Sequence, residues 1–311
     1  PDVANALLEL GRILGTLDRH RDATGAFRRA LRIMDRYAKM RDETIRRLWV
    51  QAASLLGGSL RVEARYADAE VSLERAARMA ERWLGPRDLD LAGVLNELGM
   101  LRKYQGRFAE APAFYRRALA ILRANGLAES DEAASLHHNL GGIAHARGRF
   151  AAAEGPARKA VEMRERLRGP THPATAADLA ALAPIVEARG RLDEAEGLYR
   201  RALAIFRRRL GPGSYEVSIN EAALGKLQAK RGRTAVGERL VRRALAVQLR
   251  VLGPRHHDVA ITLTQLAFVE RLCGRTAAAR RTLTRALAVY RRAVGDAHPQ
   301  TRACRAELAA L

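Results

Sequence analysis

Apolar residues recur along this chain at the spacing of amphipathic helices, in pairs separated by a short polar turn. Near residue 95, leucines stand at positions 91, 95, 98 and 101, so they fall on one face of a helix. The stretch Gln105-Gly106-Arg107 carries the residue types of a turn. A second apolar helix face follows, formed by Ala111, Tyr115, Ala118, Leu119 and Leu122. The pattern predicts a helical hairpin.

The same hairpin returns with a period of 42 residues. The turn glycines keep this period, at Gly106, Gly148, Gly190, Gly232 and Gly274. A second register keeps it too, at Ala76, Ala118, Ala160, Ala202, Ala244 and Ala286. Two registers with one period indicate a solenoid, whose units bury their apolar faces only by stacking on one another.

Small residues stand where the two helices of each hairpin should cross. In the first helices they are Gly11, Gly57, Gly99, Gly141, Ala183, Gly225 and Ala267. In the second helices they are Ala23, Ala69, Ala111, Ala153, Ala195, Gly237 and Ala279. Helix axes that pack together lie about 8–10 Å apart, and a small residue at the crossing allows that approach.

Gly-Pro pairs mark several of the linkers between hairpins, as in Leu84-Gly85-Pro86, Leu210-Gly211-Pro212 and Leu252-Gly253-Pro254. The glycine suits a left-handed helix cap, and the proline cannot continue the helix. Together with the small and large positions above, these linkers resemble the tetratricopeptide repeat (TPR), and the longer unit resembles the kinesin-light-chain type.

The resemblance implies an all-α fold, a right-handed α-solenoid of seven TPR-type helical hairpins plus a C-terminal half-repeat cap. It covers nearly the whole chain as a single superhelix over residues 1–311. The expected repeats are 1–42, 43–86, 87–128, 129–170, 171–212, 213–254 and 255–296, with the cap at 297–311.

Composition agrees with an all-helical chain and adds a strong positive charge. The chain is 48% hydrophobic and only 5% aromatic, and its formal net charge is +21. Such a charge raises nucleic acid, acidic surfaces and acidic peptides as partners. All but five of the 55 basic residues are arginine, which together with abundant Ala, Gly and Leu resembles the coding bias of a GC-rich genome. Charge alone therefore does not select the partner.

The sequence carries no pattern that predicts catalysis or a cofactor. The phosphate-binding and hydrolase motifs GxxxxGKS/T, GxGxxG, GxSxG and HExxH are absent. His137, His138 and His145 cluster on one predicted helix, but no carboxylate stands where it would complete a metal site. We therefore expect a non-enzymatic protein without catalytic residues, cofactor or metal, whose histidines contact a partner or solvent. His172, His256, His257 and His298 belong to linkers, where capping or packing is the expected role.

In TPR arrays the first helices line a concave groove, and the resemblance places a peptide-binding surface there. The expected groove residues are Asn96, Met100, Lys103, Tyr104, Ser135, His138, His145, Lys226, Lys230 and Arg271. The groove cations Arg61, Lys103, Lys226, Lys230 and Arg271 outnumber the one groove acid, Glu187. An extended, acidic or phosphorylated segment of a protein partner is therefore the favoured ligand. The alternative is that these are ordinary solvated positions with no ligand.

Two further functions stay open. Proteins with such arrays often carry a kinase, a nucleotide-switch module or a caspase-like protease, so this chain could be a sensing or autoinhibitory arm. Its start at Pro1, without an initiator Met, leaves room for such a domain. The third function is nucleic-acid binding through a convex ladder of cations in the second helices, at Arg29, Arg75, Arg117, Lys159, Arg201, Arg243 and Arg285.

Composition also favours a cytoplasmic protein that does not enter a membrane. The two cysteines, Cys273 and Cys304, suggest no disulfide framework. No run of 18 apolar residues exists, and the chain does not start with a signal or transit peptide. Partner identity, pathway and oligomeric state cannot be inferred from these patterns.

Overall fold

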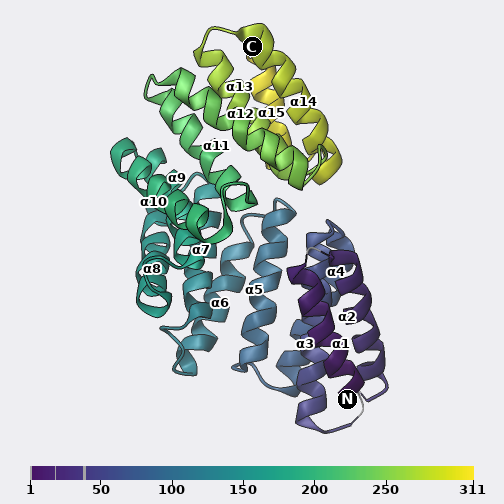
Figure 1. Cartoon of the computed structure of the whole chain (residues 1–311). Coiled ribbons are helices and arrows are strands. Elements are labelled where there is room, and N and C mark those ends of the chain that lie inside the picture. Colours follow the sequence, from purple (N-terminus) through teal and green to yellow (C-terminus); the bar gives the residue numbers. More distant parts are fainter. Residues whose placement is uncertain (1, 18, 38–39) are drawn as a thin grey trace. The chain divides into compact units, whose positions relative to one another are not determined.

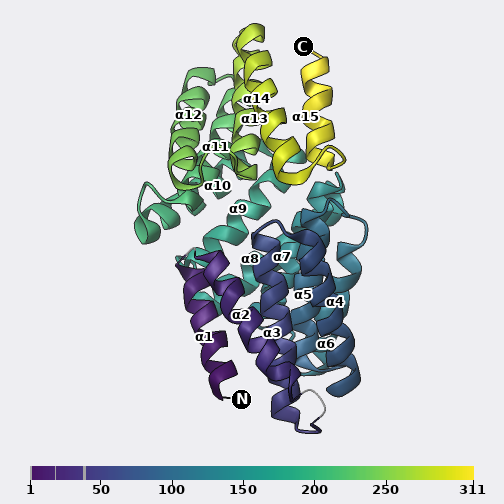
Figure 2. The same cartoon turned by 90° about the vertical axis from the view of Figure 1, so that its right-hand side faces the viewer.

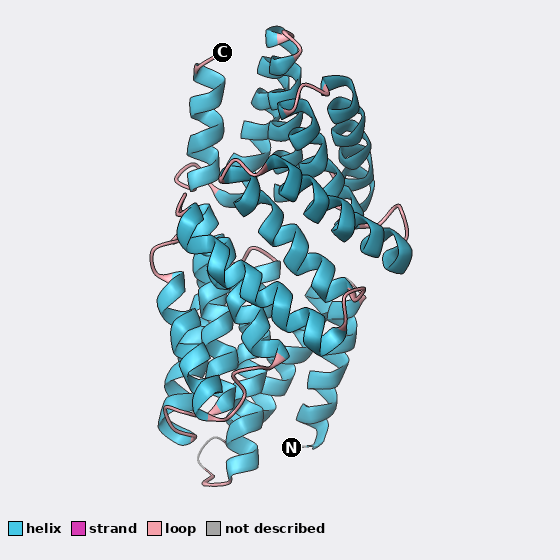
Figure 3. Ribbon diagram, turned by 90° about the vertical axis from the view of Figure 1, so that its left-hand side faces the viewer, coloured by secondary structure: helices cyan, strands magenta, loops and turns pink. Residues whose placement is uncertain are grey.

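The computed structural model describes residues 2–17, 19–37 and 40–311, and within them every regular element is an α-helix (Figures 1 and 3). In chain order they are α1 Asp2–Thr16, α2 His20–Asp35, α3 Glu43–Val62, α4 Tyr66–Trp83, α5 Leu89–Tyr104, α6 Ala111–Ala124, α7 Asp131–Ala146 and α8 Phe150–Arg168. They continue as α9 Pro173–Ala188, α10 Leu192–Leu210, α11 Tyr215–Lys230, α12 Thr234–Val251, α13 His257–Leu272, α14 Thr276–Val294 and α15 Pro299–Ala309. The predicted all-α fold of seven hairpins and a half-repeat is confirmed.

The chain divides into two compact units, residues 1–139 and 140–311. Consecutive helices pack as antiparallel neighbours from α1 to α6 in the first unit and from α8 to α15 in the second. In the first unit, α1, α2 and α3 lie side by side (Figures 1 and 2). First helices of successive repeats also touch, α1 with α3 and α3 with α5 in the first unit, α9 with α11 and α11 with α13 in the second. The first helices therefore form one layer of each unit.

Glycines at the helix crossings hold each hairpin together by letting its helices touch. A Cβ added at Gly99 would lie 2.4 Å from the ring of Tyr115, and one at Gly57 would lie 2.4 Å from Leu73. At Gly225 the obstacle is backbone, because an added Cβ would lie 2.7 Å from the carbonyl oxygen of Gly237. The expected crossing positions are confirmed at these hairpins.

A capping side chain starts most of the first helices. Asp42, Asp88, Ser130, His172, Ser214, His256 and His298 each accept a hydrogen bond from a backbone N–H two or three residues later. From Asp88 onward these caps keep the 42-residue period. The cap satisfies one of the open N–H groups at a helix start. The capping role expected for His172, His256 and His298 is confirmed.

Arginines beside four of the turns tie their hairpin to the one before it. Arg107 binds Glu70, Arg191 binds Glu154, Arg233 binds Glu196 and Arg275 binds Glu238, each pair 37 residues apart. The hydrogen bond from Arg191 is the main cause that lowers the pKa of Glu154 to about 2. Much of the arginine excess thus serves contacts between repeats.

We predict that Gly225→Ala lowers the free energy of unfolding by about 1–3 kcal/mol, because the new methyl group would collide with the backbone of Gly237. Gly197→Ala is the matched control in the same unit, since an added Cβ there meets nothing within 4 Å. It should stabilise the protein by up to about 1 kcal/mol through helix propensity. Urea denaturation followed by circular dichroism measures both, and equal effects would contradict the packing argument.

We also predict that acid weakens the attachment of α15 through His298. Burial of this imidazole, with His257 and Arg302 acting in the same direction, lowers the pKa of His298 to about 4. The unfolded chain takes up a proton near a pKa of about 6.5, so this stability is full above that pH and is lost between about 6.5 and 4.

The variant His298→Asn keeps a capping side chain but does not titrate. The wild-type protein should lose on the order of 1–3 kcal/mol more than this variant between pH 7 and pH 4. Thermal unfolding across that range, with hydrogen exchange in α15, measures the difference. Identical pH profiles of the wild type and the variant would show that His298 does not cause the loss of stability in acid.

Candidate functional site

The expected groove residues divide between the two units. Asn96, Met100, Lys103 and Tyr104 lie on α5, and Ser135 and His138 lie on α7, in the first unit. His145, at the end of α7, belongs to the second unit with Lys226 and Lys230 of α11 and Arg271 of α13. All ten stand on first helices, which form one layer of each unit.

A hollow of about 530 Å³ in the first unit brings two of these residues together. Asn96 and Ser135 line it, with Glu132 as the charged residue among its walls. The remaining lining is apolar or has no side chain, from Leu89, Ala92, Gly93, Leu122, Leu127 and Leu136. The sequence reasoning missed Gly93 and Glu132.

Amide groups form a small network beside this hollow. Asn139 Nδ2 donates to Asn96 Oδ1 at 2.9 Å, and Asn96 Nδ2 lies 3.9 Å from the sulfur of Met100. Ser135 Oγ donates to the backbone oxygen of Asp131 at 2.9 Å. Asn96 and Met100 are therefore in contact, and an asparagine pair links successive first helices.

Tyr104 belongs to a separate cluster near the other end of α5. Tyr104 is 39% exposed, and its ring stacks on that of Tyr66 with centroids 6.4 Å apart. Arg61 Cζ lies 5.2 Å from the centroid of the Tyr104 ring. Arg61 also binds Glu97 at 3.2 Å. Arg61 was expected to add positive charge to the groove. This expectation needs correction, because Glu97 neutralises the charge of Arg61.

Lys103 and His138 complete the first unit's set. Lys103 is exposed and follows Asn96 by two helical turns, so it lies on the same face of α5. His138 is half-buried on α7. Neither lines the hollow that Asn96 and Ser135 share.

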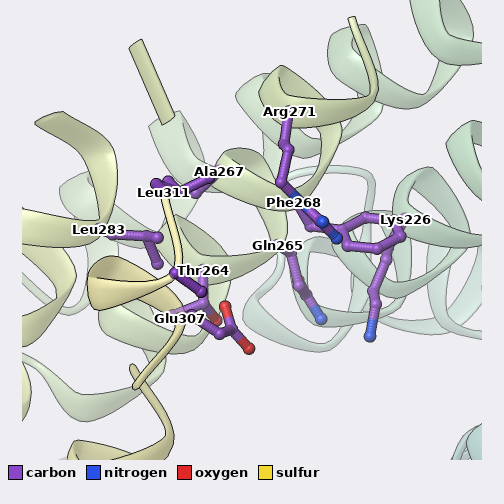
Figure 4. A pocket seen from close by; sticks show the side chains of 10 residues that line it. Lys226, Thr264, Gln265, Ala267, Phe268, Arg271, Leu283, Glu307 and Leu311 are labelled. Carbon is purple, nitrogen blue, oxygen red and sulfur yellow. The ribbon is translucent and has the colours of Figure 1, made fainter. Parts of the chain in front are cut away.

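The second unit holds a hollow of about 390 Å³ whose lining joins two of the expected cations (Figure 4). Lys226 Nζ lies 5.5 Å and Arg271 Cζ 5.7 Å from the centroid of the Phe268 ring. Figure 4 shows both side chains beside this ring, with Glu307 of α15 on the other side of the view. Within the described residues, neither Lys226 nor Arg271 forms an ion pair.

The other two expected residues of this unit are already engaged. Lys230 Nζ lies 3.6 Å from a carboxylate oxygen of Glu187, so this groove acid and this groove cation offset each other. His145 packs against Phe150 with ring centroids 5.4 Å apart. Lys226 and Arg271 are therefore the two expected cations that line a hollow and form no ion pair within the described residues, although Glu307 also lines this hollow.

The cation ladder of the second helices carries ion pairs between repeats. Arg75 binds Asp35 of the preceding repeat, Arg117 binds Glu81, and Arg201 binds Glu165. Arg243 instead binds Glu221 of its own repeat, a residue that is only 3% exposed. At these positions the positive charge is met by the protein's own carboxylates.

The described residues hold no cluster of three or more His, Cys, Asp or Glu side chains able to bind a metal ion. Among the same residues, no helix is long and apolar enough to cross a membrane.

Cys304 is buried, which raises the pKa of its thiol to about 11.

The chain belongs to the tetratricopeptide repeat family, whose model matches residues 50–124, 132–208, 215–292 and 258–311. The resemblance to the tetratricopeptide repeat is thereby confirmed. No curated protein matches the sequence.

Solved structures with the same kind of fold are similar to this chain at low identity. The Rap conjugation gene regulator of the plasmid pLS20, in a complex with a peptide, is 15% identical with a TM-score of 0.71, covering 92% of this chain and 73% of its own. A Signal Transduction ATPase with Numerous Domains that has a tetratricopeptide repeat sensor, from Pyrococcus horikoshii, is 14% identical with a TM-score of 0.60, covering 96% of this chain and 44% of its own.

A putative kinesin light chain with nearly identical TPR-like repeats, from Podosopora anserina, is 20% identical. The alignment covers 64% of this chain and 93% of that one, with a TM-score of 0.49. Levels of identity this low show the fold alone.

Proposed function

We propose that this chain is a non-enzymatic scaffold that binds an extended, acidic segment of a partner protein on its first helices. The observation that carries the proposal is the hollow of the second unit, where Lys226 and Arg271 flank Phe268 without a carboxylate partner among the described residues. Two like charges near one ring repel each other, and a bound anion would relieve that repulsion. A carboxylate or phosphate from the ligand supplies this anion.

The aromatic ring adds a surface for the ligand's apolar groups. Phe268 is half-buried and lies between the two cations, so a side chain next to the acidic residue would pack on it. Mixed apolar and charged contacts of this kind suit an extended peptide. The peptide complex of the Rap regulator shows that a protein of similar fold holds a peptide, which supports the same ligand class here.

A second candidate is the sensing arm of a larger signalling protein. It is favoured by the ATPase of similar fold, in which the tetratricopeptide repeats are described as a sensor. Both functions use the same ligand surface, so they differ in what else the native protein contains. Nucleic-acid binding through the second helices is disfavoured, because Arg75, Arg117, Arg201 and Arg243 already bind carboxylates.

The test measures fluorescence anisotropy of a labelled peptide in which glutamate alternates with alanine, and of its lysine counterpart. We expect saturable binding of the glutamate peptide and a loss of at least about tenfold in affinity for Lys226→Glu/Arg271→Glu, because each cation contributes a charge-assisted contact. The control is Arg208→Glu/Arg239→Glu, which makes the same charge change at exposed positions of α10 and α12.

Equal binding of the two peptides, or equal losses in both double variants, would contradict the proposal. A single-stranded RNA oligonucleotide tests the alternative in the same assay. If the second helices bound nucleic acid, Arg208→Glu/Arg239→Glu or Arg117→Glu would weaken RNA binding, and that binding would fall steeply with salt.

A further inference from the structure

Gly93 lies inside helix α5 at the hollow of the first unit, and nothing in the packing requires a glycine there. An added Cβ at Gly93 meets nothing within 4 Å, whereas one at Gly99 of the same helix would lie 2.4 Å from Tyr115. Glycine inside a helix costs about 1 kcal/mol relative to alanine. Gly99 therefore serves the helix crossing, and Gly93 leaves open space.

The same register carries a side chain in the other repeats. At steps of 42 residues from Gly93 stand Gln51, Ser135, Ala177, Ile219 and Ile261. Gly93 removes that side chain in this repeat alone, and the lining around it is mostly apolar. Gly93 therefore leaves its position in the lining of the hollow without a side chain.

The walls of the hollow are suited to an aliphatic side chain. Leu122 and Leu136 are each 3% exposed and form its buried part, while Leu89 and Leu127 remain 41% and 37% exposed at its edge. Exposed leucines that gather around a concave, apolar surface mark a contact site. Covering them with an aliphatic group would remove apolar surface from water.

Polar groups around the hollow define what should flank that aliphatic group. Asn96 Oδ1 already accepts from Asn139. Among the residues that the structure describes, the Asn96 amide nitrogen makes only a 3.9 Å contact to the sulfur of Met100, so it can donate to a backbone carbonyl of a ligand. Glu132, which is exposed, is the charged residue of the lining. A neighbouring basic residue of the ligand would complement it.

We propose that this hollow binds a leucine-sized aliphatic side chain of a partner segment, with an arginine or lysine next to it facing Glu132. This inference rests on the proposed function only in requiring a polypeptide ligand. The two sites are otherwise separate: this one lies in the first unit and selects a basic residue of the ligand, whereas Lys226 and Arg271 lie in the second unit and select an acidic one. It assigns Gly93 as the residue that determines which side chain enters.

The test uses the full chain with labelled leucine methyl groups and monitors them by NMR. The probes are the capped dipeptides arginyl-leucine, arginyl-alanine and glutamyl-leucine. We expect saturable shifts of Leu89, Leu122, Leu127 and Leu136, with arginyl-leucine binding at least about tenfold more tightly than arginyl-alanine, since leucine buries more apolar surface. Glutamyl-leucine should bind more weakly than arginyl-leucine because of repulsion by Glu132.

The decisive variant is Gly93→Leu, which adds an isobutyl group to the lining of the hollow. This group should occupy the space of the ligand's side chain and abolish these shifts. Because it replaces a helix-interior glycine with a good helix former, it should fold at least as well as the wild type. Gly25→Leu in α2 is the control, since an added Cβ there also meets nothing within 4 Å and Gly25 lies outside the hollow. It should leave binding unchanged.

Binding that survives Gly93→Leu, or equal affinities for the leucine and alanine probes, would overturn the site. Preference for glutamyl-leucine would overturn the charge assignment. Lys226→Glu/Arg271→Glu should leave arginyl-leucine binding intact, so failure of the second-unit site and failure of this one can be told apart.

Discussion

The close approach of the two helices in each hairpin is the contact on which the rest of the structure depends. It requires a residue without a side chain, or nearly so, at the crossing, as at Gly225 beside the Gly237 carbonyl and at Gly99 beside Tyr115. Once the helices are this close, the large apolar residues of the hairpin turn toward the next repeat and must be covered by it. The crossing thus makes each repeat dependent on its neighbours.

Ion pairs then fix how neighbouring repeats stack. The turn arginines reach back 37 residues to a glutamate, as Arg233 does to Glu196, and the second helices are joined by pairs such as Arg117 with Glu81. Exposed pairs of this kind each contribute little stability, but they repeat the same contact from one repeat to the next. This arrangement uses much of the positive charge of the second helices and the turns.

The repeat architecture could be predicted from the sequence because period, turn glycines and small residues are local signals that repeat. The capping residues would also have been found by the same period, since Asp88, Ser130 and Ser214 stand in one register. The charge of the first helices could not be predicted, because it depends on which residues meet across repeats. Arg61 lies against Glu97, 36 residues away, and a list of groove cations cannot show this.

Gly93 and Gly99 show that packing, like charge, cannot be predicted from the sequence alone. Both are glycines of one helix, six residues apart, and in the sequence only Gly99 follows the repeat period. In the structure they differ: Tyr115 fills the space beside Gly99, whereas the space beside Gly93 is open. The departure of Gly93 from the repeat period can be read from the sequence, but the hollow beside it could be recognised only from the neighbouring side chains.

These observations change how the net charge of +21 bears on function. A cation attracts a ligand strongly only where the protein does not supply its counterion, since a paired arginine would have to give up one partner to gain another. Arg201 and Lys230 have carboxylates beside them, whereas Lys226 and Arg271 have an aromatic ring between them. In the function proposed above, ligand selectivity would therefore depend on cations such as Lys226 and Arg271, which lie beside an aromatic ring and form no ion pair within the described residues.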